Sequence, residues 1–163
     1  MTADVHEPAK PAPSTRIERH LDAPRSAVYR ALLDPQAIRI WMVPDGMTSE
    51  IHAFDARVGG AFRVSLTYEA ADAVGKSSAH VDTYHGRFIE LVTDERVVEV
   101  MEFETTDPAM QSLMTVTFTL ADAGTGTALS AVHENLPPGL SPDDNELGWN
   151  LSLDKLARYL ASR

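Results

Sequence analysis

The sequence has 163 residues, of which 44% are hydrophobic and 23% charged, a composition typical of one globular domain. Cysteine does not occur, which excludes disulfides, thiol nucleophiles and thiolate metal sites. The formal net charge is −10, and no cluster of lysine and arginine interrupts it, which argues against nucleic acid and anionic membranes as partners. With no apolar run of about 18 residues and no signal-peptide pattern, we expect a cytoplasmic protein.

The pattern of apolar residues changes near residue 15. Residues 1–14 contain three prolines and no apolar periodicity, so we expect a flexible tail there. Residues 15–163 are patterned throughout and are expected to form a single domain. A short strand is predicted over 15–21, where Ile17 and Leu21 lie on one face.

Two short helices should follow this strand. Asp22 and Pro24 resemble an N-cap with proline in the first turn, and apolar residues then recur at helical spacing as far as residue 33. A second helix is expected to begin near Asp34 and Pro35 and to end at Trp41.

Most of the remaining chain has the alternation of apolar and polar residues that is typical of strands. Gly59 and Gly60 are expected in a turn that needs positive φ, and 69–79 should be a polar loop. The other links are short, which favours antiparallel pairing over parallel crossovers. The predicted strands lie near residues 49–56, 62–68, 80–92, 95–104, 113–120 and 127–135.

A long helix should close the chain. Ser141 and Pro142 provide a cap and a first-turn proline, and an apolar stripe follows at helical spacing, formed by Trp149, Leu153, Leu156 and Leu160. The order of elements predicts an α+β fold in which a curved antiparallel sheet of about six or seven strands wraps around this helix. Such a sheet cannot lie flush against a cylinder, so we expect a cavity between them.

Four segments in this order resemble the activator-of-heat-shock-ATPase homologue family of the START-like, or SRPBCC, superfamily. They are residues 41–46 (WMVPDG), 54–62 (FDARVGGAF), 85–97 (HGRFIELVTDERV) and 148–156 (GWNLSLDKL). The resemblance covers about residues 15–161 and implies the helix-grip fold, a sheet that grips a long helix around an apolar cavity. Members of the superfamily include hydrophobic-ligand binders, cyclase- and aromatase-like enzymes, and a co-chaperone that stimulates the heat-shock ATPase.

Bulky residues on the inward faces of these elements are the expected lining of a ligand cavity. We predict that this lining consists of Trp41, Phe62, Val64, Leu66, Tyr68, Met101, Phe103, Val116, Phe118, Trp149, Leu153 and Leu156. For Trp149, a place in the core is favoured over a contact between its indole N–H and a ligand. Methionine is also frequent, which suits either an adaptable pocket or ordinary core packing; the residues are Met42, Met47, Met101, Met110 and Met114.

Three residues are weak candidates for acid/base chemistry. Glu99 shares a strand face with Met101 and Phe103, where the family tends to have an apolar residue; it either faces the cavity or faces solvent near the start of its strand. His133 either reaches the mouth of the cavity or is hydrogen-bonded beneath the following loop. Tyr84 either presents its hydroxyl inward or is packed and satisfied.

The sequence therefore supports several functions. Binding of a small hydrophobic or amphipathic molecule comes first, because no HExxH, GxSxG or phosphate-binding loop signals an enzyme. The alternatives are a cyclase-, aromatase- or hydrolase-like enzyme that uses Glu99, His133 and Tyr84, and a co-chaperone-like stimulator of a heat-shock ATPase. A chaperone partner and a homodimer stay open. His80 and His85 should point to opposite faces of a strand, and we expect neither a metal nor a cofactor.

Overall fold

The computed structural model describes residues 12–69 and 81–163. In this part of the chain, one sheet of seven strands is accompanied by three α-helices and one short 3-10 helix. The strands are β1 (Thr15–Leu21), β2 (Met47–Phe54), β3 (Ala61–Tyr68), β4 (Val81–Val92), β5 (Arg96–Phe103), β6 (Met114–Ala123) and β7 (Gly126–Glu134). The helices are α1 (Arg25–Leu33), α2 (Pro35–Trp41), η1 (Pro108–Met110) and α3 (Pro142–Ala161).

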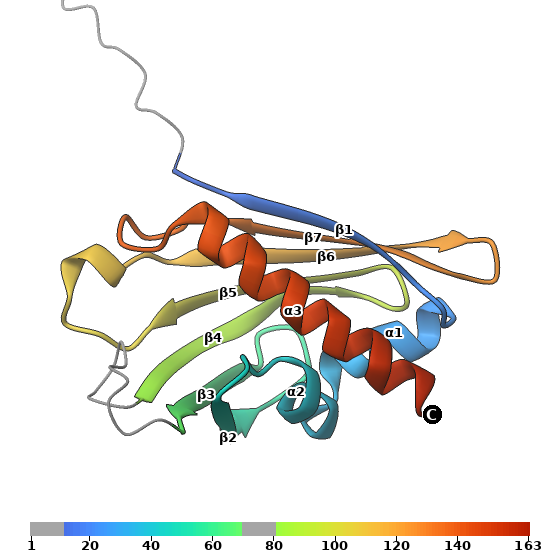
Figure 1. Cartoon of the computed structure of the whole chain (residues 1–163), viewed down its shortest axis with the longest axis horizontal. Coiled ribbons are helices and arrows are strands. Elements are labelled where there is room, and N and C mark those ends of the chain that lie inside the picture. Colours follow the sequence, from blue (N-terminus) through green and yellow to red (C-terminus); the bar gives the residue numbers. More distant parts are fainter. Residues whose placement is uncertain (1–11, 70–80) are drawn as a thin grey trace, which may run out of the picture.

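The strands pair in the order β1-β7-β6-β5-β4-β3-β2, and every neighbouring pair is antiparallel. Figure 1 shows α3 crossing one face of the curved sheet, with α1 and α2 near the C-terminal end of α3. This arrangement confirms the predicted α+β helix-grip fold, including the two short helices after the first strand.

Strand β1 lies at the edge of the sheet and pairs with β7, the last strand of the chain. Thr15 lies opposite His133, and Leu21 lies opposite Thr127. Just before β1, the carbonyl of Pro13 accepts a hydrogen bond from the amide of Leu136 at 3.0 Å. The first and last strands therefore stabilise each other by pairing. The hydrophobic pattern of the sequence alone does not specify this long-range pairing.

The start of α1 differs from our prediction. Pro24 occupies the N-cap position, no side chain caps the helix, and Asp22 lies outside it with its carboxylate 3.2 Å from Nε2 of His20. The start of α2 agrees with the prediction, because the Asp34 side chain accepts a hydrogen bond from the amide of Gln36. A proline thus lies at the start of both helices, but only α2 has a side-chain cap.

The turn between β2 and β3 uses its two glycines for different reasons. Gly59 has φ of +82°, a conformation that favours glycine, as we expected. Gly60 was expected to share this property but does not. A Cβ atom on Gly60 would lie 1.9 Å from the carbonyl oxygen of Asp55, so close backbone approach excludes a side chain at this position.

Helix α3 is fixed to the rest of the fold at several points. Its N-cap Ser141 accepts a hydrogen bond from the amide of Asp144, as the sequence predicts. Asp154 accepts a hydrogen bond of 2.6 Å from Arg19 of β1. Lys155 lies 2.8 Å from the carboxylate of Asp45, in the segment after α2. These contacts hold α3 along β1 and α2.

The core fills the space beneath α3. Trp41 is fully buried, and its indole N–H donates to the carbonyl of Ala31 at 3.0 Å. The Phe118 ring lies between two indole rings, 6.5 Å from Trp41 and 5.7 Å from Trp149 between centroids, both in edge-on geometry. This aromatic row ties α2, β6 and α3 together.

Two expectations concern residues that the structure describes only in part. Most of the predicted tail, residues 1–11, and most of the predicted polar loop, residues 70–80 with His80, lie outside the described ranges.

Truncation of the apolar stripe of α3 should show its contribution to stability. Leu153 is fully buried, so Leu153→Ala leaves a cavity and should lower the free energy of unfolding by roughly 3 kcal/mol. Leu151→Ala, on the same helix but 39% exposed, should cost roughly 0.5 kcal/mol. Urea denaturation of both variants measures the difference, and equal losses would contradict the observed packing.

Candidate functional site

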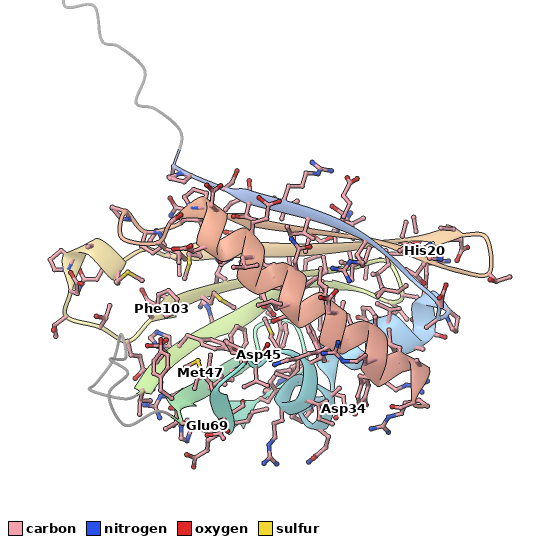
Figure 2. The ribbon with its side chains drawn as sticks, in the orientation of Figure 1. His20, Asp34, Asp45, Met47, Glu69 and Phe103 are labelled. Carbon is pink, nitrogen blue, oxygen red and sulfur yellow. The ribbon has the colours of Figure 1, made fainter. Side chains whose placement is uncertain are left out.

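A groove of about 370 Å³ lies between the sheet and the first half of α3. Its lining is largely apolar, with polar groups among it. The residues are Met42, Pro44, Asp45, Met47, Leu66, Tyr68, Asp82, Tyr84, Met101, Phe103, His133, Leu140, Asp144, Asn145, Gly148, Trp149 and Ser152. Figure 2 labels Asp45, Met47 and Phe103 among these. The volume lies within the range of pockets that hold small molecules.

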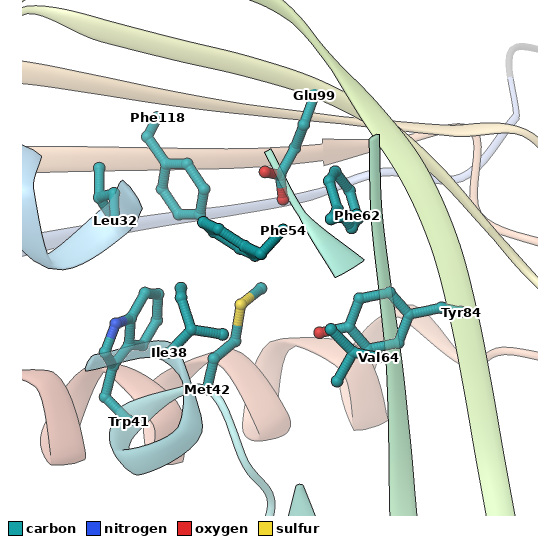
Figure 3. Close-up of a pocket in the computed structure, with 10 residues that line it drawn as sticks. All are labelled: Leu32, Ile38, Trp41, Met42, Phe54, Phe62, Val64, Tyr84, Glu99 and Phe118. Atoms are coloured by element: carbon teal, nitrogen blue, oxygen red, sulfur yellow. The ribbon is translucent and has the colours of Figure 1, made fainter. Parts of the chain in front are cut away.

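A second, much smaller cavity of about 10 Å³ lies deeper, beneath α2. Aromatic and aliphatic side chains surround it, with one carboxyl group among them (Figure 3); they are Leu32, Ile38, Trp41, Met42, Phe54, Phe62, Val64, Tyr84, Glu99 and Phe118. Met42 and Tyr84 line both the groove and this inner cavity, so these two side chains lie between the two spaces. The inner cavity has room for one group the size of a water molecule.

The predicted lining residues divide among three places. The groove takes Leu66, Tyr68, Met101, Phe103 and Trp149. The inner cavity takes Trp41, Phe62, Val64 and Phe118. The rest, Val116, Leu153 and Leu156, are completely buried and are not among the residues that line either space.

Some lining residues were outside the prediction. Met42 and Met47 flank the turn after α2, and sequence analysis left them open as pocket or core residues. Phe54, at the end of β2, was missed because its place opposite Phe62 depends on the strand register, which the sequence alone does not give. Met114 is buried against His133, away from the groove lining.

Glu99 points into the inner cavity, so the interpretation that it faces solvent is wrong. Its side chain comes from β5, where Glu99 lies opposite Phe88 of β4 and Val116 of β6. The residue is 7% exposed, and the described residues offer its carboxyl group no hydrogen bond or ion pair. Burial raises the pKa of Glu99 to about 8, because an apolar environment disfavours the carboxylate.

Tyr84 borders the same cavity from β4. It is 7% exposed, and no described residue forms a hydrogen bond with its hydroxyl group. Burial, together with the charge of nearby Glu99, raises the pKa of Tyr84, so the phenol stays neutral. Two buried side chains whose polar groups have no hydrogen-bond partner among the described residues therefore border one small space.

His133 belongs to a different cluster, where β7 meets the start of α3. Its Nδ1 accepts hydrogen bonds from the indole N–H of Trp149 at 3.1 Å and from the side-chain amide of Asn145 at 3.2 Å. Asn145 also donates to the hydroxyl of Thr15 on β1 at 3.0 Å. His133 thus lines the groove while it joins β7 to α3, and the indole N–H of Trp149 is used within the protein.

This geometry determines the protonation of His133. Because Nδ1 accepts two hydrogen bonds, the ring proton must lie on Nε2, which is 3.1 Å from the sulfur of Met114. Burial lowers the pKa of His133 to about 4, because an apolar environment disfavours the imidazolium. The side chain is neutral near pH 7.

The three acid/base candidates do not share one space. Glu99 and Tyr84 both line the inner cavity, whereas His133 and Tyr84 line the groove. Tyr84 is the one member of this trio that borders both spaces.

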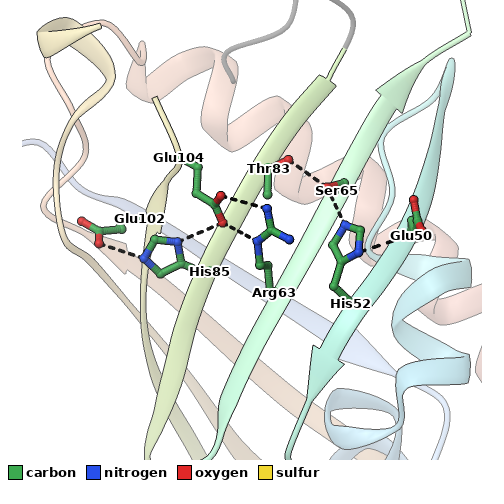
Figure 4. A network of polar contacts seen from close by, with 8 residues as sticks. All are labelled: Glu50, His52, Arg63, Ser65, Thr83, His85, Glu102 and Glu104. Carbon is green, nitrogen blue, oxygen red and sulfur yellow. Dashed lines mark hydrogen bonds and ion pairs between the residues drawn. The ribbon is translucent and has the colours of Figure 1, made fainter. Parts of the chain in front are cut away.

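A row of polar side chains crosses the opposite face of the sheet (Figure 4). Arg63 makes two hydrogen bonds to Glu104, at 2.7 and 3.0 Å, and His85 bridges Glu104 and Glu102. The Arg63 guanidinium, with a smaller contribution from His85, lowers the pKa of Glu104 to about 2. None of these residues lines the groove, so we assign the row to cross-strand pairing.

No group of three or more histidine, aspartate or glutamate side chains in residues 12–69 and 81–163 is arranged to hold a metal ion. Among the helices of the same ranges, none is long and apolar enough to cross a membrane.

Comparisons with known proteins agree with this architecture. The family described as "Activator of Hsp90 ATPase homolog 1-like protein" matches residues 22–161. A crystal structure of a protein from Chromobacterium violaceum is 35% identical and has a TM-score of 0.81; the match covers 90% of this chain and 96% of that chain. No curated protein matches the sequence significantly.

More distant structures share the fold. An AHSA1-like protein from Aeromonas hydrophila is 21% identical with a TM-score of 0.71, over 92% of this chain and 93% of that chain. DynU16, a protein of the dynemicin biosynthetic locus, is 22% identical with a TM-score of 0.67; the match covers 93% of this chain and 48% of DynU16.

Replacement of Glu99 should change how stability depends on pH. The folded-state pKa lies above the ordinary value of 4.5, so stability that is present below about pH 4.5 is lost as the pH rises through 8. Between pH 4.5 and 7.5 the wild type should lose roughly 3 kcal/mol more than Glu99→Gln in urea denaturation. Glu134→Gln, an exposed carboxyl at the end of β7, is the matched control and should behave as the wild type.

The protonation of His133 can be read directly by NMR. Long-range ¹⁵N–¹H spectra should show the tautomer with the proton on Nε2, and this ring should not titrate between pH 5 and 8. Because the pKa is lowered on folding, His133 stabilises the fold above about pH 6.5, and this contribution is lost as the pH falls toward 4. Titration of His133 above pH 6 would contradict the hydrogen bonding described here.

Proposed function

The chain belongs to the activator of Hsp90 ATPase homolog 1-like family, and from that premise we propose that it binds a small hydrophobic or amphipathic molecule in the groove between the sheet and α3. The observation that carries this proposal is the groove itself, about 370 Å³ in volume and lined mainly by apolar residues with several polar groups among them.

The lining of the groove suits such a ligand. Met42, Met47 and Met101 supply side chains that can adjust to different apolar shapes, and Phe103 and Trp149 offer flat surfaces for packing. Burial of apolar ligand surface against these groups would supply roughly 25 cal/mol for each Å² removed from water.

The alternative of a cyclase-like or hydrolase-like enzyme has weaker support. Such an enzyme would need its acid and base within reach of one substrate. Glu99 and Tyr84 meet this condition in the inner cavity, but that cavity has a volume of only about 10 Å³. His133, which lines the groove, is neutral and engaged by Trp149 and Asn145. Stimulation of a heat-shock ATPase stays a third hypothesis, tested by adding the purified protein to the chaperone.

A neutral fluorescent probe tests the proposal. N-phenyl-1-naphthylamine should bind to the purified protein with a dissociation constant in the micromolar range and gain fluorescence. Gly148 of α3 lines the groove, and a Cβ atom at this position would meet nothing within 4 Å. Gly148→Phe should therefore fill the groove without disturbing the fold and weaken probe binding about tenfold or more.

Gly148→Ala is the matched control. It adds one methyl group at the same helical position and should leave probe affinity close to that of the wild type, while it increases stability by up to about 1 kcal/mol. If the probe does not bind, or if it binds equally to Gly148→Phe, the groove is not the binding site.

A further inference from the structure

We propose that the molecule bound in the groove carries a primary ammonium group, which enters the inner cavity and is held there by Glu99 and Tyr84. This inference rests on the groove-binding function proposed above and adds the chemical class of the ligand: an amine with an apolar body. The inner cavity is the part of the site that selects this class.

The position and size of the inner cavity support a small terminal group. Its volume of about 10 Å³ accepts a group the size of a water molecule, such as –NH₃⁺, and excludes a bulky one. Met42 and Tyr84 border both the inner cavity and the groove, so a ligand whose body lies in the groove would enter the inner cavity where these two side chains separate the spaces. Met42 is unbranched and can rotate to admit an alkyl chain.

The polar groups of the inner cavity match an ammonium group. Its N–H donors need acceptors, and the cavity offers the carboxyl oxygens of Glu99 and the hydroxyl oxygen of Tyr84, neither of which has a hydrogen-bond partner among the described residues. A carboxyl side chain that is only 7% exposed is costly without a partner, and a cation beside it reduces that cost. A hydrogen bond between two charged groups is also stronger than one between neutral groups.

The rings around Glu99 favour the same ligand. Trp41, Phe54, Phe62, Tyr84 and Phe118 all line the inner cavity, and Figure 3 shows the carboxyl group of Glu99 directed into the space among them. Aromatic rings attract cations through their negative faces, most strongly where water is excluded. A carboxylic acid ligand would instead place a second acid beside Glu99.

The charges around the groove also bear on the preference for a cation. Three carboxyl groups, those of Asp45, Asp82 and Asp144, lie in its lining, and none of the lysines and arginines of residues 12–69 and 81–163 does. Asp82 accepts a hydrogen bond from the hydroxyl group of Tyr68 at 3.1 Å. Lys155 pairs with Asp45 from outside the lining. The chain as a whole carries a formal charge of −10. The net negative charge of the chain favours the approach of a cationic amphiphile over that of an anionic one.

Ammonium binding should displace the proton of Glu99. Burial raises the pKa of Glu99 to about 8, so the carboxyl group is largely protonated at pH 7 in the empty protein. The amine arrives already protonated, because alkylamines titrate near pH 10. When the ion pair forms, Glu99 gives its proton to the solvent. Tyr84 is the other titratable group in the described lining of the inner cavity, and it stays neutral throughout.

Three ligands with the same tail and different head groups test the proposal. Octylamine, 1-octanol and octanoate are titrated against the protein at pH 7 in competition with N-phenyl-1-naphthylamine. We expect octylamine to bind about tenfold or more tightly than 1-octanol, and octanoate to bind most weakly. Calorimetry in two buffers of different ionisation enthalpy should reveal release of roughly one proton for each octylamine bound.

Variants assign the preference to Glu99. Glu99→Gln keeps the size of the side chain and should remove the preference for octylamine while 1-octanol binds as before; Glu134→Gln, exposed at the end of β7, should retain the preference. Equal affinity for octylamine and 1-octanol in the wild type, or a preference that survives in Glu99→Gln, would overturn the ammonium proposal and leave groove binding intact. Absence of binding by the probe and all three ligands would overturn both proposals.

Discussion

A helix is a straight cylinder, and the sheet that α3 crosses is twisted and curved, so the two can touch closely over only part of their length. In this protein α3 makes its close contacts with β1 and α2. Arg19 of β1 forms an ion pair with Asp154, and Asp45, in the segment after α2, forms one with Lys155. On the side of β3, β4 and β5, the gap between helix and sheet is left to side chains. The groove and the inner cavity both lie on that side, which makes the site a consequence of the helix position.

The general architecture follows from local chemistry that a sequence displays. The strand alternation, the proline-marked helix starts and the Ser141 cap act within a few residues, and the predicted elements agree with the structure. The N-cap of α1 escaped prediction because Asp22 and Pro24 both suit a helix start, and the chain uses Pro24. The role of Gly60 escaped because it depends on where the backbone of Asp55 returns, which no local pattern contains.

The site was less predictable for a physical reason. Both faces of β4 and β5 carry apolar residues, and the register shift between Phe88 and Glu90 changes which side chains face inward. Glu99 could be placed in the cavity or in solvent until its neighbours Phe88 and Val116 were known. Likewise, the resemblance implied an apolar cavity, but its division at Met42 and Tyr84 into a groove and a small inner space depends on how these side chains pack.

The pairing of β1 with β7 also affects how the chain can fold during synthesis. Thr15 must meet His133, and the Asn145 amide of α3 then bonds both residues. Because the ribosome synthesises β1 before β7, β1 stays unpaired until more than a hundred further residues have been synthesised. Contacts between residues this distant along the chain slow folding. An unpaired edge strand is also prone to pair with another chain or with the wrong strand. Charged side chains disfavour such wrong pairing, and β1 carries three of them, those of Arg16, Glu18 and Arg19.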